Sequence, residues 1–304
     1  MAKPHGYIPA AWKKIFQFVE KDFSSICFGL IKLGPAEMIS TSTQPVLINV
    51  GEEQRVSGLL QAPREAHACY VLGHGAGAGM AHPFLAAIAD GLAERGIATL
   101  RYQFPYMEQG SKRPDTPRVA HATVRAAVLE AARLVPGLAL FAGGKSFGGR
   151  MTSQAQAAGA LPGVQAIVFL GFPLHPPGKP SQERGKHLFD VQIPMLFLQG
   201  TRDDLANLPL METLCQQLGA RATLKLFQDA DHSFHVPART GRKDAEVRAE
   251  LLDALADWIN KICNVTAGAG SVLTFFANTD SKKMQDCPQR TNYEPLPRHQ
   301  RLLV

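Results

Sequence analysis

Between residues 45 and 262, short apolar runs alternate with longer segments of helical periodicity, and this alternation restricts the fold more than any other feature of the sequence. The runs are almost continuously hydrophobic, as is typical of strands buried on both faces of a parallel sheet. We expect strands at 45–50, 55–63, 68–75, 97–105, 138–144, 165–173, 194–200 and 222–230. Helices are expected at 82–96, 118–135, 147–160, 209–219 and 244–262. The sequence therefore predicts an α/β fold with a mostly parallel, doubly wound sheet, helices on both faces, and functional residues at the carboxyl ends of the strands.

The stretch AGGKSFGGR, residues 142–150, ends one expected strand and opens the next expected helix. Its Gly-Lys-Ser resembles the end of a phosphate-binding loop, but that loop would need glycine at position 139, which is alanine. The same residues fit G-x-S-x-G, the sharp turn that presents a nucleophilic serine between two small neighbours, here Gly144 and Gly148. Ser146 is therefore the predicted nucleophile.

A serine hydroxyl becomes nucleophilic only beside a general base, and the base needs a carboxylate to orient it. In proteins with this serine turn, the acid and then the base follow later strands of the sheet. Asp203 follows the strand expected at 194–200, and His232 lies just past the last expected strand, 222–230. Ser146, Asp203 and His232 are thus the predicted catalytic residues, with Asp204 and His235 left open as alternatives.

Backbone N–H groups are needed to stabilise the oxyanion that forms when serine attacks a carbonyl. One is expected from Phe147, directly after the nucleophile. The other is expected from the small-residue loop HGAGAG at 74–79, where Ala76 is preferred and Gly77 is the second choice. The same loop does not fit the dinucleotide pattern G-x-G-x-x-G, because position 80 is Met.

Residues 38–263 resemble α/β-hydrolase-fold proteins and, more narrowly, a dienelactone-hydrolase-related group of small predicted hydrolases. The stretches that carry the resemblance are GHGAGAGMAHPF, RYQFPYMEQGSKRPD, GGKSFGGRM, GFPLHPPGKP, QGTRDDL and DADHSF. That group shares its domain with the hydrolase-like part of a subunit of the eukaryotic chromatin NSL complex. The resemblance implies an eight-stranded type of sheet and the triad Ser146, Asp203 and His232. It implies no substrate.

The predicted function is a serine hydrolase that cleaves a small carboxylic ester or thioester through an acyl-enzyme. Only about twenty residues, starting at Leu174, occupy the place where many lipases insert a helical lid, so we expect a short cap and an open cleft. His175 in this segment is interpreted as a loop residue. Other residues expected near the substrate are Gly75, Gly77, Lys145 and Tyr106. The alternative is a non-catalytic scaffold or binding module with the same fold.

The chain divides by composition into three parts: an N-terminal extension at 1–37, the α/β domain at 38–263, and a flexible tail at 264–304. The extension contains one amphipathic stretch, AWKKIFQFVEKDF, which either is an appended segment or binds a surface. The tail mixes Gly, Pro, Asn and Thr without periodicity.

Charge and cysteine content limit the partners that we expect. The 22 basic and 20 acidic residues between 38 and 263 leave this part almost neutral, so no nucleic-acid partner is expected. Five cysteines without a C-x-x-C pair favour reduced thiols and a cytoplasmic location. The apolar runs are too short or too interrupted for integral membrane association, and neither a metal nor another cofactor is expected. A homodimer stays open.

Overall fold

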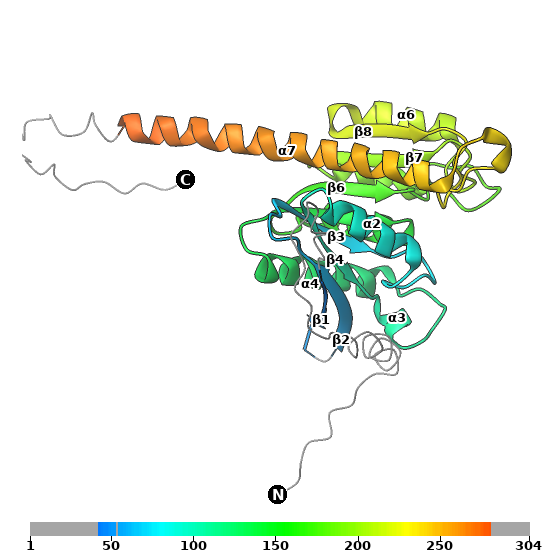
Figure 1. Ribbon diagram of the computed structural model, residues 1–304, viewed down its shortest axis with the longest axis horizontal. Coiled ribbons are helices and arrows are strands. Elements are labelled where there is room, and N and C mark those ends of the chain that lie inside the picture. The colour runs from blue at the N-terminus through cyan, green and yellow to red at the C-terminus, as the bar shows by residue number, and fades with distance from the viewer. Residues whose placement is uncertain (1–41, 53, 281–304) are drawn as a thin grey trace, which may run out of the picture. The chain divides into compact units, whose positions relative to one another are not determined.

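Eight strands form one sheet in the computed structural model of the chain, which describes residues 42–52 and 54–280 (Figure 1). The strands are β1 (Thr43–Val50), β2 (Gln54–Gln61), β3 (Ala68–Gly73), β4 (Ile97–Tyr102), β5 (Ala139–Lys145), β6 (Val164–Leu170), β7 (Met195–Gly200) and β8 (Ala222–Phe227). Their order across the sheet is β1-β2-β4-β3-β5-β6-β7-β8. β2 is antiparallel to both of its neighbours, whereas β3 to β8 run parallel. The predicted mostly parallel sheet is confirmed.

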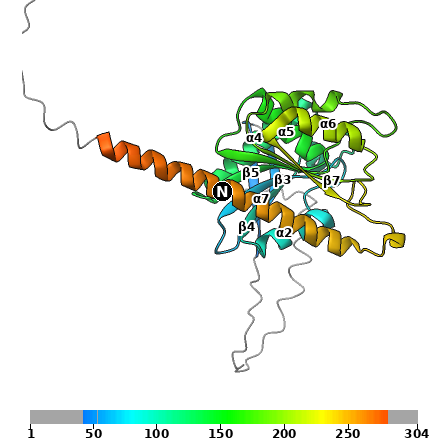
Figure 2. The same cartoon turned by 90° about the horizontal axis from the view of Figure 1, so that it is seen from above.

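Helices cover both faces of this sheet, as Figure 2 shows. One face carries α4 (Pro117–Leu134), α5 (Phe147–Ala158) and α6 (Leu208–Leu218), and the other carries α2 (Pro83–Ala93) and the first part of α7 (Asp244–Asp280). α2 and α7 touch where Gly91 faces Leu252, and an ion pair of 2.6 Å joins Arg95 to Asp253. The doubly wound arrangement predicted from the sequence is therefore confirmed.

Most residues of the inner strands are buried, which explains their continuous hydrophobic character. All six residues of β3, β4 and β7 are buried. Between β6 and β7, the rings of Phe169 and Phe197 stack with centroids 4.5 Å apart, and Phe172 meets Phe169 edge-on at 5.1 Å. This packing fixes the carboxyl ends of β6 and β7, which lead into the loops of the candidate site.

The structure adds short elements that the sequence did not predict. These are α3 (Pro105–Glu108) and three 3₁₀ segments: η2 (Glu183–Asp190), η3 (Gly219–Arg221) and η4 (Ala238–Thr240). η2 lies in the segment predicted to form a short cap and packs against α5 and α6. Each element is only one to three turns long, which is too short to produce a clear periodic pattern.

The end of the last helix differs from the prediction. α7 continues to Asp280, whereas the sequence pattern predicted an end at 262. Its two late glycines lower helix stability by about 1 kcal/mol each but do not break the helix, and no proline occurs between residues 244 and 287. The predicted extension at 1–37 and the tail beyond 280 lie outside the described residues, so the proposed division of the chain stays a prediction.

Candidate active site

Ser146 occupies a strained turn between β5 and α5. Its backbone has φ 51° and ψ −110°, a combination that non-glycine residues rarely adopt and that is typical of functional sites. The turn is possible because its flanks lack side chains. A Cβ atom on Gly144, whose φ is +150°, would lie 2.2 Å from the Gly73 carbonyl oxygen, and one on Gly148 would lie 2.5 Å from the same oxygen. The glycines of G-x-S-x-G are thus required by the close approach of β3.

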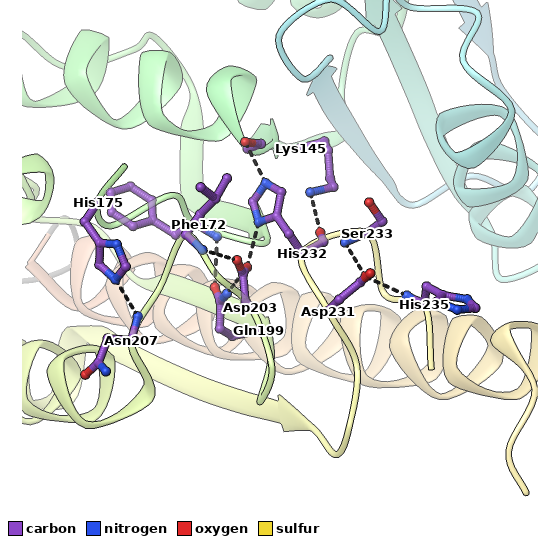
Figure 3. Close-up of polar contacts among 12 residues, drawn as sticks. Lys145, Phe172, His175, Gln199, Asp203, Asn207, Asp231, His232, Ser233 and His235 are labelled. Atoms are coloured by element: carbon purple, nitrogen blue, oxygen red, sulfur yellow. Dashed lines mark hydrogen bonds and ion pairs between the residues drawn. The ribbon is translucent and has the colours of Figure 1, made fainter. Parts of the chain in front are cut away.

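A continuous chain of hydrogen bonds links Ser146, His232 and Asp203. The Ser146 Oγ lies 2.8 Å from His232 Nε2, and His232 Nδ1 lies 2.6 Å from Asp203 Oδ2. Figure 3 shows the His232 ring directed toward Asp203. Because a carboxylate only accepts, the Nδ1 proton of a neutral His232 is held on the Asp203 side. Nε2 is then free to accept the serine proton, as general-base chemistry requires.

The Asp203 carboxylate is surrounded by hydrogen-bond donors. Its side chain is 0% exposed; Oδ1 accepts from the Leu205 N–H at 2.8 Å, and Oδ2 accepts from the Gln199 side-chain amide as well as from His232. The Oε1 of Gln199 accepts in turn from the Phe172 N–H at 2.9 Å (Figure 3). This network fixes which oxygen faces His232. Gln199 was not predicted from the sequence, although its place at the end of β7 marks it as a neighbour of the site.

The two alternatives from the sequence lie outside this hydrogen-bonded chain. Asp204 is exposed to solvent. His235 is also exposed, and its Nδ1 lies 2.8 Å from Asp244 Oδ2. The geometry therefore selects Asp203 and His232 as the partners of Ser146, while the catalytic role of all three remains a proposal.

A second serine–histidine pair occurs on the face of α5. Ser153 Oγ lies 2.8 Å from His187 Nε2, and it also lies within hydrogen-bonding distance, 3.1 Å, of the Arg150 carbonyl oxygen. Burial, together with the nearby Arg150 and His121, lowers the pKa of His187 to about 4. Such a histidine is a weak base at neutral pH, and Ser153 lies within a regular helix. Because both pairs place a serine Oγ 2.8 Å from a histidine Nε2, Ser153 and His187 serve as an internal control for the reactivity expected of Ser146 and His232.

The side chain of His74 controls the direction of one peptide group beside Ser146. His74 Nε2 accepts from the Phe104 N–H at 3.0 Å, so Nδ1 carries the proton and donates to the Gly75 carbonyl oxygen at 2.8 Å. The Ala78 N–H also donates to this oxygen, at 3.2 Å. In a trans peptide the C=O and the following N–H point in opposite directions. The Ala76 N–H is therefore directed away from His74.

His74 is suited to this positioning role because it stays neutral. It is completely buried, and burial lowers its pKa to about 4 despite the hydrogen bond to the Gly75 carbonyl. Protonation would remove the acceptor that Phe104 needs. In the sequence, His74 stands out only as the start of the HGAGAG loop, and this role was not predicted.

The second-choice donor, Gly77, is already engaged. Its N–H donates to the Tyr106 hydroxyl at 3.0 Å, and Tyr106 is buried with its ring 6.2 Å from that of Phe147. Neither Gly77 nor Tyr106 lines the pocket beside Ser146. Their hydrogen bond instead supports the loop at 74–79 from the side of α3. Their predicted contact with substrate stays a prediction.

The preferred oxyanion donors have free N–H groups. Among the described residues, neither the Ala76 N–H nor the Phe147 N–H donates a hydrogen bond. Ala76 lines the pocket, and Phe147 begins α5, where the helix dipole favours negative charge. This position is appropriate for stabilising an oxyanion at Ser146.

A pocket of about 430 Å³ opens beside Ser146 and His232. Its other lining residues are Gly75, Ala76, Ala78, His82, Phe84, Leu85, Lys145, Leu205 and Ser233. The segment between Leu174 and Ile193 contributes none of them. His175 in that segment accepts from the Asn207 N–H at 2.7 Å and is a structural loop residue (Figure 3).

Lys145 connects the nucleophile turn with the histidine loop. Its Nζ donates to the His232 carbonyl oxygen at 2.7 Å (Figure 3). The same atom lies 5.9 Å from the centroid of the Phe234 ring. Burial lowers the pKa of Lys145 to about 8, although the carboxylates of Asp203 and Asp231 act in the opposite direction. The hydrogen bond holds the backbone that carries the general base, and the side chain also lines the pocket.

The part of the chain that the structure describes contains no cluster of three or more His, Cys, Asp or Glu side chains that could hold a metal ion. Within the same residues, no helix combines the length and the apolar character that a transmembrane span requires.

Comparison with known proteins places this geometry in context. Residues 66–260 match a family model described as an alpha/beta hydrolase domain. A dienelactone hydrolase from Anabaena variabilis is 21% identical, with 72% of this chain and 97% of that chain covered at a TM-score of 0.59. A serine hydrolase without lid from Xanthomonas campestris is 21% identical, with 73% and 98% covered at a TM-score of 0.56. A serine hydrolase homologue from Coxiella burnetii is 20% identical, with 69% and 95% covered at a TM-score of 0.56.

Proposed function

Because the chain belongs to the alpha/beta hydrolase domain family, we propose that it is a serine hydrolase that cleaves a small carboxylic ester or thioester through an acyl-enzyme. The observation that carries this proposal is the hydrogen-bonded chain from Ser146 through His232 to Asp203, which begins on a strained turn at the edge of a pocket. A scaffold has no physical need for this arrangement.

The proposed reaction begins when His232 Nε2 takes the Ser146 hydroxyl proton as Oγ attacks the substrate carbonyl carbon. The carbonyl oxygen becomes an oxyanion, which the N–H groups of Ala76 and Phe147 stabilise. Asp203 stabilises the imidazolium and keeps its orientation. His232 then protonates the leaving alcohol or thiol, and the acyl group remains on Ser146. Water attacks the acyl-enzyme by the same route and releases the acid.

The size and openness of the pocket support a small substrate. Its volume of about 430 Å³ is near the lower end of the usual range for ligand pockets, roughly 300–1,000 Å³. The Leu174–Ile193 segment packs toward α5 and α6 through η2, so it forms no lid over Ser146. Two similar structures, a dienelactone hydrolase and a serine hydrolase without lid, agree with this proposal. A cytoplasmic location, a homodimer and kinship with the chromatin-complex subunit stay predictions.

The test is a hydrolysis assay with 4-nitrophenyl esters and acyl thioesters of two to eight carbons. We expect turnover that is greatest for one range of chain lengths and absent in Ser146→Ala. Ser153→Ala serves as the matched control, because Ser153 also contacts a histidine but lies within α5. Folded wild-type protein without turnover of any of these compounds would favour the non-catalytic scaffold.

A further inference from the structure

A second hollow of about 360 Å³ adjoins the pocket beside Ser146. The two share Phe84 of α2 and Ser233, the residue after His232. A substrate group that extends past these two residues would therefore enter the second hollow. Nothing in the proposed reaction at Ser146 uses this space.

The walls of the second hollow are apolar and firmly held. Phe84 and Phe234 stack with centroids 5.9 Å apart and an angle of 1° between the rings, and Pro83 and Ala87 complete this side. Phe234 adopts φ 62°, and its N–H donates to the Asp231 carbonyl oxygen at 3.0 Å. Such walls suit a hydrocarbon linker, which gains free energy when it leaves water.

Arg248 gives the hollow a positive charge that is not used elsewhere. It lies on α7 and is partly buried, yet its guanidinium donates no hydrogen bond and forms no ion pair within 4.0 Å among the described residues. By contrast, Arg95 and Arg242 pair with Asp253 and Glu250 at 2.6 and 2.8 Å. The five N–H donors of Arg248 are available to an anion, and their planar arrangement matches a carboxylate or a phosphate.

The acidic residue in the same hollow is already occupied. Asp244 Oδ2 lies 2.8 Å from His235 Nδ1, and Oδ1 accepts from the Val236 N–H at 3.0 Å. These hydrogen bonds from His235 and Val236 lower the pKa of the Asp244 carboxyl group, and its longer-range attraction to Arg248 acts in the same direction. Its contacts hold it to the loop after His232 and leave the guanidinium of Arg248 open.

From this arrangement we infer that the second hollow is a substrate subsite for an anionic group. The substrate is an ester or thioester whose scissile carbonyl lies at Ser146 and whose carboxylate or phosphate, several atoms away, is bound by Arg248. The linker between them passes Ser233 and packs on Phe84 and Phe234. The inference rests on the proposed hydrolase function, which it extends to a class of substrate.

The kinetic test compares esters that differ only in a terminal charge. The 4-nitrophenyl monoesters of succinic, adipic and suberic acid are compared with the butyrate, hexanoate and octanoate of equal carbon number. For at least one chain length, we expect kcat/KM for the anionic ester to exceed that of its neutral partner in the wild type. We expect Arg248→Gln to lower this ratio about tenfold, the size of a lost charge-assisted hydrogen bond on a partly exposed group.

Two control variants separate a local contact from the general charge. Arg248→Lys keeps the charge without the planar donors and should lower the ratio less than Arg248→Gln. Arg239→Gln removes an exposed positive charge outside the hollow and should leave the ratio at the wild-type value. Equal ratios in wild type and Arg248→Gln at all three chain lengths would overturn the inference, while the proposed hydrolase function would stand.

A binding test does not depend on turnover. Titration calorimetry on full-length Ser146→Ala protein measures the affinity for monomethyl adipate and for butyl phosphate, with and without Arg248→Gln. A loss of about tenfold on adding Arg248→Gln supports the subsite, and the tighter of the two compounds identifies carboxylate or phosphate as the preferred group. Unchanged or undetectable binding of both compounds in both proteins would overturn the inference. Binding that depends on Arg248 in a protein without esterase activity would overturn the proposed function and the assignment of the bound compound as a substrate, and would leave Arg248 as an anion-binding residue.

Discussion

Replacing Asp203 with Asn should almost abolish catalysis without unfolding the protein. The three groups that face the Asp203 carboxylate are all donors: the Leu205 N–H, the Gln199 amide and His232 Nδ1. Asn offers only one oxygen and adds an NH₂ group. With that oxygen toward Leu205, the NH₂ group faces His232, which then turns its protonated Nε2 toward Ser146. With the oxygen toward His232, the NH₂ group faces the Leu205 N–H instead.

The magnitude follows from these two orientations. Facing donors leave a buried N–H unpaired, which costs about 1–3 kcal/mol of stability. In either orientation the negative charge that stabilises the imidazolium is lost. We therefore expect kcat to fall by roughly 10⁴, or ~5 kcal/mol of transition-state stabilisation.

The assay is the kcat of Asp203→Asn for the best 4-nitrophenyl ester, with folding checked by thermal denaturation. Asp204→Asn is the matched control, because it makes the same chemical change on the adjacent, exposed residue and should leave kcat unchanged. A loss smaller than tenfold in Asp203→Asn, or an equal loss in Asp204→Asn, would refute the assignment of Asp203 as the orienting acid.

Three further predictions address the residues around the triad. His74→Leu should lower kcat by ~10²–10³ because the Ala76 N–H loses its fixed direction. Burial lowers the pKa of His74 to about 4 from 6.5, so the unfolded chain binds an additional proton between these pH values, and the stability of wild type relative to the variant should fall as pH decreases from 6.5 to 4. A stability difference that does not change with pH would count against the role of His74. Lys145→Met removes the hydrogen bond to the His232 carbonyl and should lower kcat about tenfold, which is ~1.4 kcal/mol of activation free energy, with little change in KM. An unchanged kcat in steady-state assays would show that the loop carrying His232 needs no such support. Gly148→Ala places a Cβ atom 2.5 Å from the Gly73 carbonyl and should destabilise the protein by about 1–3 kcal/mol, whereas Gly159→Ala, whose new Cβ meets only the end of the Arg125 side chain at 3.4 Å, should change the melting temperature less.

The sheet was predictable because its signal is repeated along the chain. Each of the eight observed strands overlaps an expected strand, since continuous apolar runs such as PMLFLQG leave little choice for a segment buried on both faces. Helix ends are less certain from sequence. The stretch NVTAGAG has low helix propensity, yet α7 continues through it because nothing in it terminates a helix.

The candidate site was predictable where the chemistry fixes residue type and order. Ser146, Asp203 and His232 follow from the glycine-flanked turn and from two loops at the carboxyl ends of later strands. Gln199 and His74 were not found, because their roles depend on which main-chain groups they meet in space. Their residue types are too common in strands and loops to indicate a function on their own.

The position of Tyr106 could not be decided from sequence for the same reason. A tyrosine after a strand end can face a substrate or support a loop equally well. In the structure its hydroxyl accepts the Gly77 N–H, and burial raises the pKa of Tyr106, so the hydroxyl stays protonated at neutral pH. Gly75 and Gly77 of the loop thus differ in role: Gly75 lines the pocket, whereas Gly77 anchors the loop to α3.

Whether Ser146 is an activated nucleophile is measured most directly by covalent labelling of the folded protein with a fluorophosphonate probe, with the modified residue located by mass spectrometry. We expect labelling at Ser146 that is lost in Ser146→Ala and His232→Ala and is retained in Ser153→Ala. Labelling at Ser153, or no labelling of folded wild-type protein, would contradict the claim that Ser146 is an activated nucleophile.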